Sequence, residues 1–132
     1  MFNYTPAVVV TAAARSEYLE FAKAVARLAG AVILPYFRTN ADGMKLENKA
    51  QDGFDPVTRA DRDAEQLIRQ RISETYPEHG IYGEEFGLQA GNGLTWVIDP
   101  IDGTRAFMSG MLHWGVLLAL FDGENPIVGV LY

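Results

Sequence analysis

Two carboxylates stand close together after a short apolar run in this sequence. The run, Trp-Val-Ile at residues 96–98, predicts a buried strand that ends at Asp99, and Asp102 follows after a proline and Ile101. A tight turn of this length can direct both carboxylates towards one point. Because oxygen ligands of this kind favour Mg²⁺ over zinc or copper, the segment predicts a magnesium site.

The residues around this pair favour the binding of an anion. Gly103 and Thr104 offer backbone N–H groups, and a helical turn that opens at Thr104 would add its dipole. Two further carboxylates, Glu84 and Glu85, precede the strand. Since carboxylates repel a phosphate unless cations lie between them, this combination is typical of metal-assisted phosphoester hydrolysis.

Two helices are predicted upstream of these motifs. Apolar residues recur every three or four positions over residues 16–37, which predicts a helix that Ser16 caps and Pro35 ends or kinks. A second helix is predicted to begin at Thr58, in a pattern similar to a capping box, and to stop at Pro77.

The remaining patterns are those of strands. Residues 114–121 and 127–132 are strand-like runs, and the Asp122–Gly123 pair between them predicts a plain turn. Residues 44–49 show a weaker alternation. Helices followed by strands predict an α+β fold in which the helices pack against a largely antiparallel sheet.

Composition limits the classes of function. The 132 residues suffice for one compact domain, and 17 acidic against 11 basic residues give a net charge of -6, which disfavours nucleic acid and anionic membranes as partners. The absence of cysteine excludes disulfides and thiolate metal sites. The apolar run at residues 116–121 is too short to cross a membrane, so we expect a cytoplasmic protein. Because the last residues continue a strand pattern, we expect the chain to be part of a longer protein.

Three motifs of this sequence resemble, in the same order, those of the inositol monophosphatase family. Asp-Pro-Ile-Asp-Gly-Thr at 99–104 resembles the first signature of the family, and Gly-Glu-Glu at 83–85 resembles its preceding metal-binding glutamates. Asp-Pro-Val-Thr-Arg-Ala-Asp at 55–61 resembles its segment at the start of the second helix. Within the family, residues 83–87 and 104–107 are most similar to histidinol-phosphate phosphatases.

The resemblance implies a site with two or three magnesium ions. Glu84 and Asp99 would bind the first ion, together with the backbone carbonyl of Ile101. Asp99 would bridge to a second ion that Asp102 also holds. Glu85 would either contact these ligands without binding the first two ions or bind an outer metal ion.

The resemblance also implies how substrate and water are held. Asp102 and the backbone amides of Gly103 and Thr104 would receive the phosphate. Asp61 and the Thr104 hydroxyl would orient the attacking water and act as the general base.

For the whole chain, the resemblance implies a layered α/β sandwich of the sugar-phosphatase type, of which residues 1–132 supply the N-terminal part. The second signature of the family, a Trp-Asp motif, is absent from this sequence, so we expect the chain by itself to be inactive. The implied reaction is hydrolysis of a small phosphate monoester by a homodimer. Histidinol phosphate, in histidine biosynthesis, is the favoured substrate, and inositol 1-phosphate or a related sugar or nucleotide phosphate is the alternative.

Two other functions compete with this one. Haloacid-dehalogenase phosphatases carry Asp-x-Asp-Gly-Thr after a strand and use the first Asp as a nucleophile, but here two residues separate Asp99 from Asp102. The carboxylates could instead form a non-catalytic surface that binds a metal or another protein. Among other polar residues, we expect His79 to face solvent, His113 to pack or to support the ligands, and Arg105 to contact phosphate or pair with a carboxylate.

Overall fold

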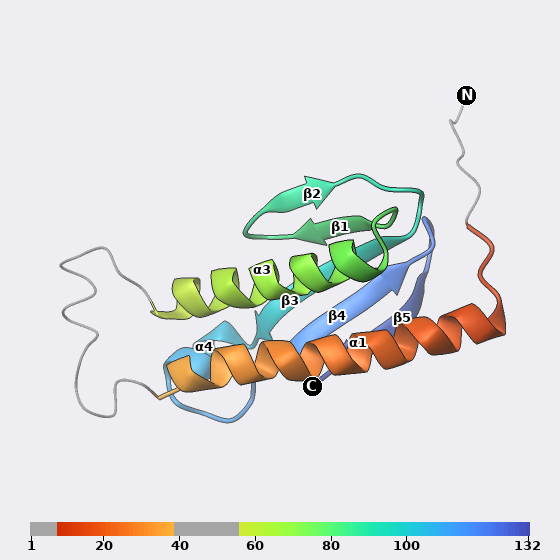
Figure 1. Ribbon diagram of the computed structural model, residues 1–132. Helices are drawn as coiled ribbons and strands as arrows, with labels where there is room; N and C mark the ends of the chain where they lie inside the picture. Colours follow the sequence, from red (N-terminus) through yellow and green to blue (C-terminus); the bar gives the residue numbers. More distant parts are fainter. Residues whose placement is uncertain (1–7, 39–55) are drawn as a thin grey trace.

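The computed structural model describes residues 8–38 and 56–132, without the side chains of residues 56–58. Two long helices lie over one face of a five-stranded sheet, and a short helix follows the central strand (Figure 1). The strand predicted at residues 44–49 lies outside the described residues. The elements are α1 (Ala12–Ile33), η1 (Leu34–Tyr36), α3 (Pro56–Thr75), β1 (Gly80–Gly83), β2 (Gly87–Gln89), β3 (Thr95–Asp102), α4 (Thr104–Met108), β4 (Gly115–Phe121) and β5 (Pro126–Leu131).

Helix α1 begins earlier than predicted because Thr11, and not Ser16, caps it. The Oγ1 atom of Thr11 accepts a hydrogen bond from the backbone N–H of Ala14 at 3.1 Å. This bond satisfies one of the donors that the first turn of a helix leaves without an intrahelical partner. The expected effect of Pro35 is confirmed, since α1 stops at Ile33 and the chain continues as the 3-10 turn η1.

Helix α3 begins at Pro56, two residues before the predicted cap at Thr58. Proline is favoured at the first helical position because the N–H that it lacks has no intrahelical partner there. The helix ends at Thr75, just before Pro77, as predicted. Ala64, Ile68 and Ile72, three apolar residues at helical spacing, are fully buried and form the inner face of the helix.

The sheet has the order β2-β1-β3-β4-β5 and is largely antiparallel, as predicted. Strands β1 and β3 are the exception and run parallel. The sequence does not predict β1 and β2, because both are short, β1 has glycine at both ends and β2 begins with glycine. The turn at Asp122 is confirmed, since its Oδ1 accepts the N–H groups of Asn125 at 2.8 Å and Glu124 at 2.9 Å. These bonds hold the pKa of Asp122 below its ordinary value.

The core lies between the two helices and one face of the sheet, and aromatic rings fill one end of it. Trp96 of β3 is fully buried, and rings of α1 and of the segment after α3 surround it. The prediction that His79 faces solvent is wrong, because its Nδ1 accepts a hydrogen bond from the Trp96 indole N–H at 3.0 Å. Burial lowers the pKa of His79 and keeps the imidazole neutral.

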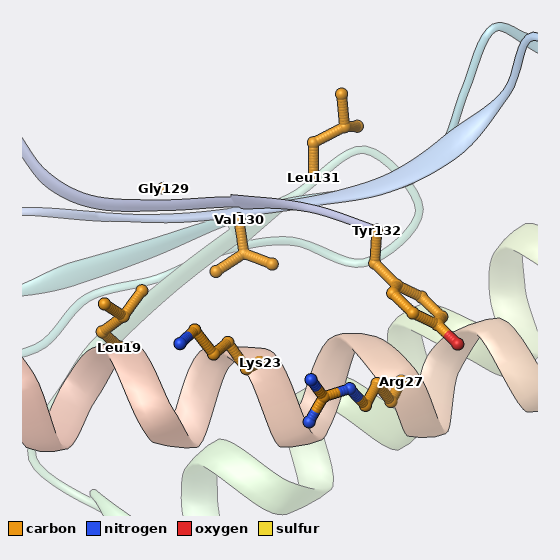
Figure 2. A pocket seen from close by; sticks show the side chains of 7 residues that line it. All are labelled: Leu19, Lys23, Arg27, Gly129, Val130, Leu131 and Tyr132. Atoms are coloured by element: carbon orange, nitrogen blue, oxygen red, sulfur yellow. The ribbon is translucent and has the colours of Figure 1, made fainter.

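A cavity of about 310 Å³ lies between α1 and β5 (Figure 2). Two cations of α1, Lys23 and Arg27, line it, and the Val130 and Tyr132 side chains point towards the helix. Leu131 points to the opposite side of the strand, which is the side that the helices leave open. Neither α1 nor any other described helix has the length and apolar character that crossing a membrane requires.

Candidate active site

The parallel pairing of β1 with β3 brings the first two predicted ligands together. Gly83, the last residue of β1, pairs with Ile98 of β3. Glu84 follows the end of β1, and Asp99 is the next residue of β3, so the two residues continue neighbouring parallel strands in the same direction. Both carboxylates therefore lie at neighbouring positions, Glu84 in an exposed turn and Asp99 half-buried.

A β-bulge decides where Asp102 points. Asp99 pairs with Leu117 and Asp102 with Gly115, so three steps along β3 match two along β4. In a regular strand, residues three apart point to opposite faces, and one extra residue restores the same face. The nearby backbone N–H of Ile101 opposes the rise in the pKa of Asp99 that burial and neighbouring charges cause. The strand thus continues to Asp102. The predicted end at Asp99 is wrong.

The start of α4 lies at the two residues for which an anion cradle is predicted, Gly103 and Thr104. The helix begins at Thr104, as expected, and Gly103 precedes it with φ 93° and ψ 43°. This left-handed conformation favours glycine, and a Cβ atom at this position would overlap the carbonyl oxygen of His113. The Thr104 hydroxyl donates a hydrogen bond to the Ile101 carbonyl at 3.2 Å. The predicted carbonyl ligand and the predicted water-orienting hydroxyl are therefore neighbours.

Helix α3 brings Asp61 to the same carboxylates. Burial, together with the nearby charges of Glu85, Asp99, Glu84 and Glu65, raises the pKa of Asp61 to about 7. Asp61 is the sixth residue of α3, so it does not cap the helix. Its carboxylate is instead crowded by those of β3 and of the turn between β1 and β2.

Asp99 lies in the same negative field. Burial raises its pKa, and the charges of Asp102 and Glu84 raise it further. Crowded carboxylates are stabilised when a cation lies among them. The donors are all carboxylate and carbonyl oxygens, which is the set that Mg²⁺ prefers. In residues 8–38 and 59–132, however, no three His, Asp or Glu side chains lie close enough together to enclose a metal ion. The type of donor atom therefore fits magnesium, although the described side chains do not enclose an ion.

Glu65 was not among the predicted site residues, and the structure places it next to the turn that carries Glu84 and Glu85. Glu65 is fully buried on α3, and its carboxylate accepts the backbone N–H groups of Glu85 at 3.1 Å and Phe86 at 3.0 Å. Its position on the apolar face of the helix, four residues before Arg69, is the signal that could have indicated a buried ion pair.

The two remaining predicted polar residues stay at the surface. The His113 side chain is exposed, which contradicts the packing role among the two expected for it. Its backbone carbonyl lies close to Gly103. Arg105 is exposed in the last turn of α4.

Replacing Asp61 by Asn should change how the stability of the metal-free protein depends on pH. The folded state holds the Asp61 proton with a pKa of about 7, above the ordinary 3.8, so the free energy of unfolding falls as the pH rises through this window. Asn does not ionise, so the variant should gain stability relative to the unaltered protein from low to neutral pH. Denaturant unfolding in the presence of a chelator, at several pH values, measures this difference. A difference that shrinks as the pH rises would contradict the crowding of Asp61.

The chain is similar to one family of known proteins over most of its length. The sequence profile of the inositol monophosphatase family matches residues 14–132. A histidinol-phosphatase of Chlorobaculum parvum is 47% identical over 103 residues, which cover 77% of this chain and 38% of that protein. A fructose-1,6-bisphosphatase/inositol-1-monophosphatase of Aquifex aeolicus is 38% identical over 118 residues, which cover 88% of this chain and 43% of that protein.

The fold shows the same similarity. The solved structure of an inositol monophosphatase from Zymomonas mobilis superposes with a TM-score of 0.72 at 35% identity, over 89% of this chain and 44% of that one. The chain therefore spans less than half the length of the proteins that it matches.

Proposed function

This chain belongs to the inositol monophosphatase family, and we propose that the whole protein is a magnesium-dependent phosphatase that hydrolyses histidinol phosphate to histidinol and phosphate. We assign residues 1–132 to its N-terminal part. The observation that carries the proposal is the meeting of Glu84 and Asp99 at the edge of β1 and β3, beside the bulge that turns Asp102 to the same side. Family membership disfavours the haloacid-dehalogenase alternative, in which an Asp attacks phosphorus directly.

The carboxylates at this edge are assigned to the metal ions. Glu84, Asp99 and Asp102 would hold two or three magnesium ions, together with the backbone carbonyl of Ile101. Glu85 would support them from the turn between β1 and β2. Bound Mg²⁺ supplies positive charge for the phosphoryl oxygens and lowers the pKa of water.

The other groups of the site hold the substrate and move the proton. The N–H groups of Gly103 and Thr104 are assigned to the phosphate oxygens, and Asp102 lies beside them. Asp61, on the neighbouring helix, would accept the proton of the attacking water as a general base. The Thr104 hydroxyl would orient that water.

The choice of substrate rests on the similarity to a histidinol-phosphatase. Inositol 1-phosphate is the second candidate, because a protein with that activity in its name matches 88% of this chain, against 77% for the histidinol-phosphatase of Chlorobaculum parvum. We expect the whole protein, with Mg²⁺, to show its highest kcat/KM on histidinol phosphate in a panel with inositol 1-phosphate, fructose 1,6-bisphosphate and a phosphoadenosine nucleotide. A preference for another member of the panel would overturn the substrate. Absence of Mg²⁺-dependent turnover on all of them would favour the non-catalytic surface.

The proposal includes a cellular role. We propose that the protein is a cytoplasmic homodimer and that it acts in histidine biosynthesis, as the similarity to histidinol-phosphatases suggests. A strain that lacks the gene should then grow only when histidine is supplied. Growth at the normal rate without histidine would contradict this role.

A further inference from the structure

Glu65 is a buried charge that the proposed reaction does not use. Its side chain has no exposed surface, although it stands on α3 only four residues from Asp61. A carboxylate in such a place is costly unless cations and N–H groups compensate it. The Arg69 Nε donates to its Oε2 at 2.9 Å, and the backbone N–H groups of Glu85 and Phe86 donate to its two oxygens.

Arg69 extends the same contact to the far end of the turn. Its guanidinium donates to the backbone carbonyl of Gly87, where β2 begins, while it also holds Glu65. The guanidinium group of Arg69 lies 5.9 Å from the centre of the Phe86 ring, and that of Arg62 lies 5.7 Å from it. Two side chains of α3, Glu65 and Arg69, therefore hold the backbone of residues 85–87, and we name this pair the Glu65 clamp.

Gly83 shows how closely the clamp and the turn fit. A Cβ atom on Gly83 would overlap the carboxyl carbon and both oxygens of Glu65. The carboxylate thus lies against the backbone of the residue before Glu84 and binds the N–H groups of the two residues after it. Glu84 is held from both sides, although its own side chain is exposed.

We propose that Glu65 is a positioning residue that fixes Glu84 and Glu85 against α3, so that Glu84 faces Asp99 ready to bind magnesium. This inference rests on the proposed function, because it gives the clamp a task in the metal site. Groups that orient metal ligands affect metal affinity strongly, and their loss typically weakens binding by about 10–100-fold. A purely structural ion pair would affect the free energy of unfolding and leave the affinity of the folded protein unchanged.

The test is Glu65→Gln in the whole protein. Gln keeps the size of the side chain and one oxygen acceptor, but it loses the charge that attracts Arg69 and one of the two acceptors. We expect Mg²⁺ affinity, measured by isothermal titration calorimetry well below the melting temperature, to fall by about 10-fold or more. Glu74→Gln is the matched control, since Glu74 is an exposed carboxylate of the same helix and should leave the affinity unchanged. An unchanged affinity in Glu65→Gln with a lower melting temperature would overturn the inference.

A second variant changes the backbone that the Glu65 carboxylate contacts, and not Glu65 itself. Gly83→Ala keeps every charge and pushes the Glu65 carboxylate away from the turn, so it should also weaken Mg²⁺ binding. This variant tests the inference independently if Glu65→Gln does not fold. The double variant should cost little more than the stronger single one, because both changes break the same contact. Normal affinity in Gly83→Ala would overturn the inference. Failure of the unaltered protein to bind Mg²⁺ would instead overturn the proposed function.

Discussion

Replacing Asp99 by Asn should abolish Mg²⁺ binding and turnover while the protein stays folded. Asn keeps the size and shape of the side chain, but it removes the charge that we assign to both metal ions. The loss of Mg²⁺ affinity should be larger than the decrease of about 10–100-fold that is typical when a group that only orients a metal ligand is removed. Stability of the metal-free protein should not fall, because the charges of Asp102 and Glu84 already disfavour an ionised Asp99. Calorimetric Mg²⁺ titration and thermal unfolding of the same preparation measure both effects.

The matched control is Asp122→Asn, the same substitution in the turn between β4 and β5. The amide oxygen of Asn can accept the same two backbone N–H groups, so neither Mg²⁺ affinity nor turnover should change. Equal effects at Asp99 and Asp122 would mean that the Asp-Gly segment at β3 is a turn and not a site.

Removing the Thr104 hydroxyl should lower the catalytic rate and leave metal binding largely unchanged. Thr104→Ala touches neither Asp99 nor Glu84, so the carboxylate ligands stay in place. General acid–base assistance is typically worth about 10²–10⁴-fold, and the loss of kcat should fall in this range. Steady-state kinetics at saturating Mg²⁺ and a parallel Mg²⁺ titration separate the two quantities. A large loss of affinity with kcat preserved would make Thr104 part of the metal site through its bond to the Ile101 carbonyl.

Asp61→Asn should lower kcat by a similar factor. The double variant with Thr104→Ala should cost little more than either single one, because the two residues serve one proton transfer. Asp61 stands in the sixth position of α3 and among other carboxylates, so its loss should not destabilise the metal-free protein. A lower melting temperature with normal turnover would remove Asp61 from the catalytic machinery.

The sequence alone determined the features that depend on neighbouring residues. The inner face of α3 follows from apolar residues at helical spacing, and the end of α1 follows from Pro35, because both effects act within one turn of a helix. The turn at Asp122 follows from its side chain, which binds the N–H groups two and three residues ahead. The segment at residues 99–104 was recognisable for the same reason, since its proline, glycine and carboxylates are contiguous.

Only the tertiary structure decided which of these residues meet. Strand β1 has four residues with glycine at both ends, so no periodicity predicts it, yet its pairing with β3 brings Glu84 to Asp99. The bulge in β3 depends on the register with β4, and it decides that Asp99 and Asp102 share a face.

Burial of polar groups was also decided by the tertiary structure. His79 and Glu65 are polar residues in polar segments of the sequence, and both are buried because distant groups satisfy them. Trp96 donates to His79 from seventeen residues away, and the turn after β1 donates to Glu65 from twenty and twenty-one residues away. The free energy of burying such a group depends on partners that only the folded chain brings to it, so spacing can place Glu65 on the inner face of α3 next to Arg69 but cannot show which backbone groups satisfy it.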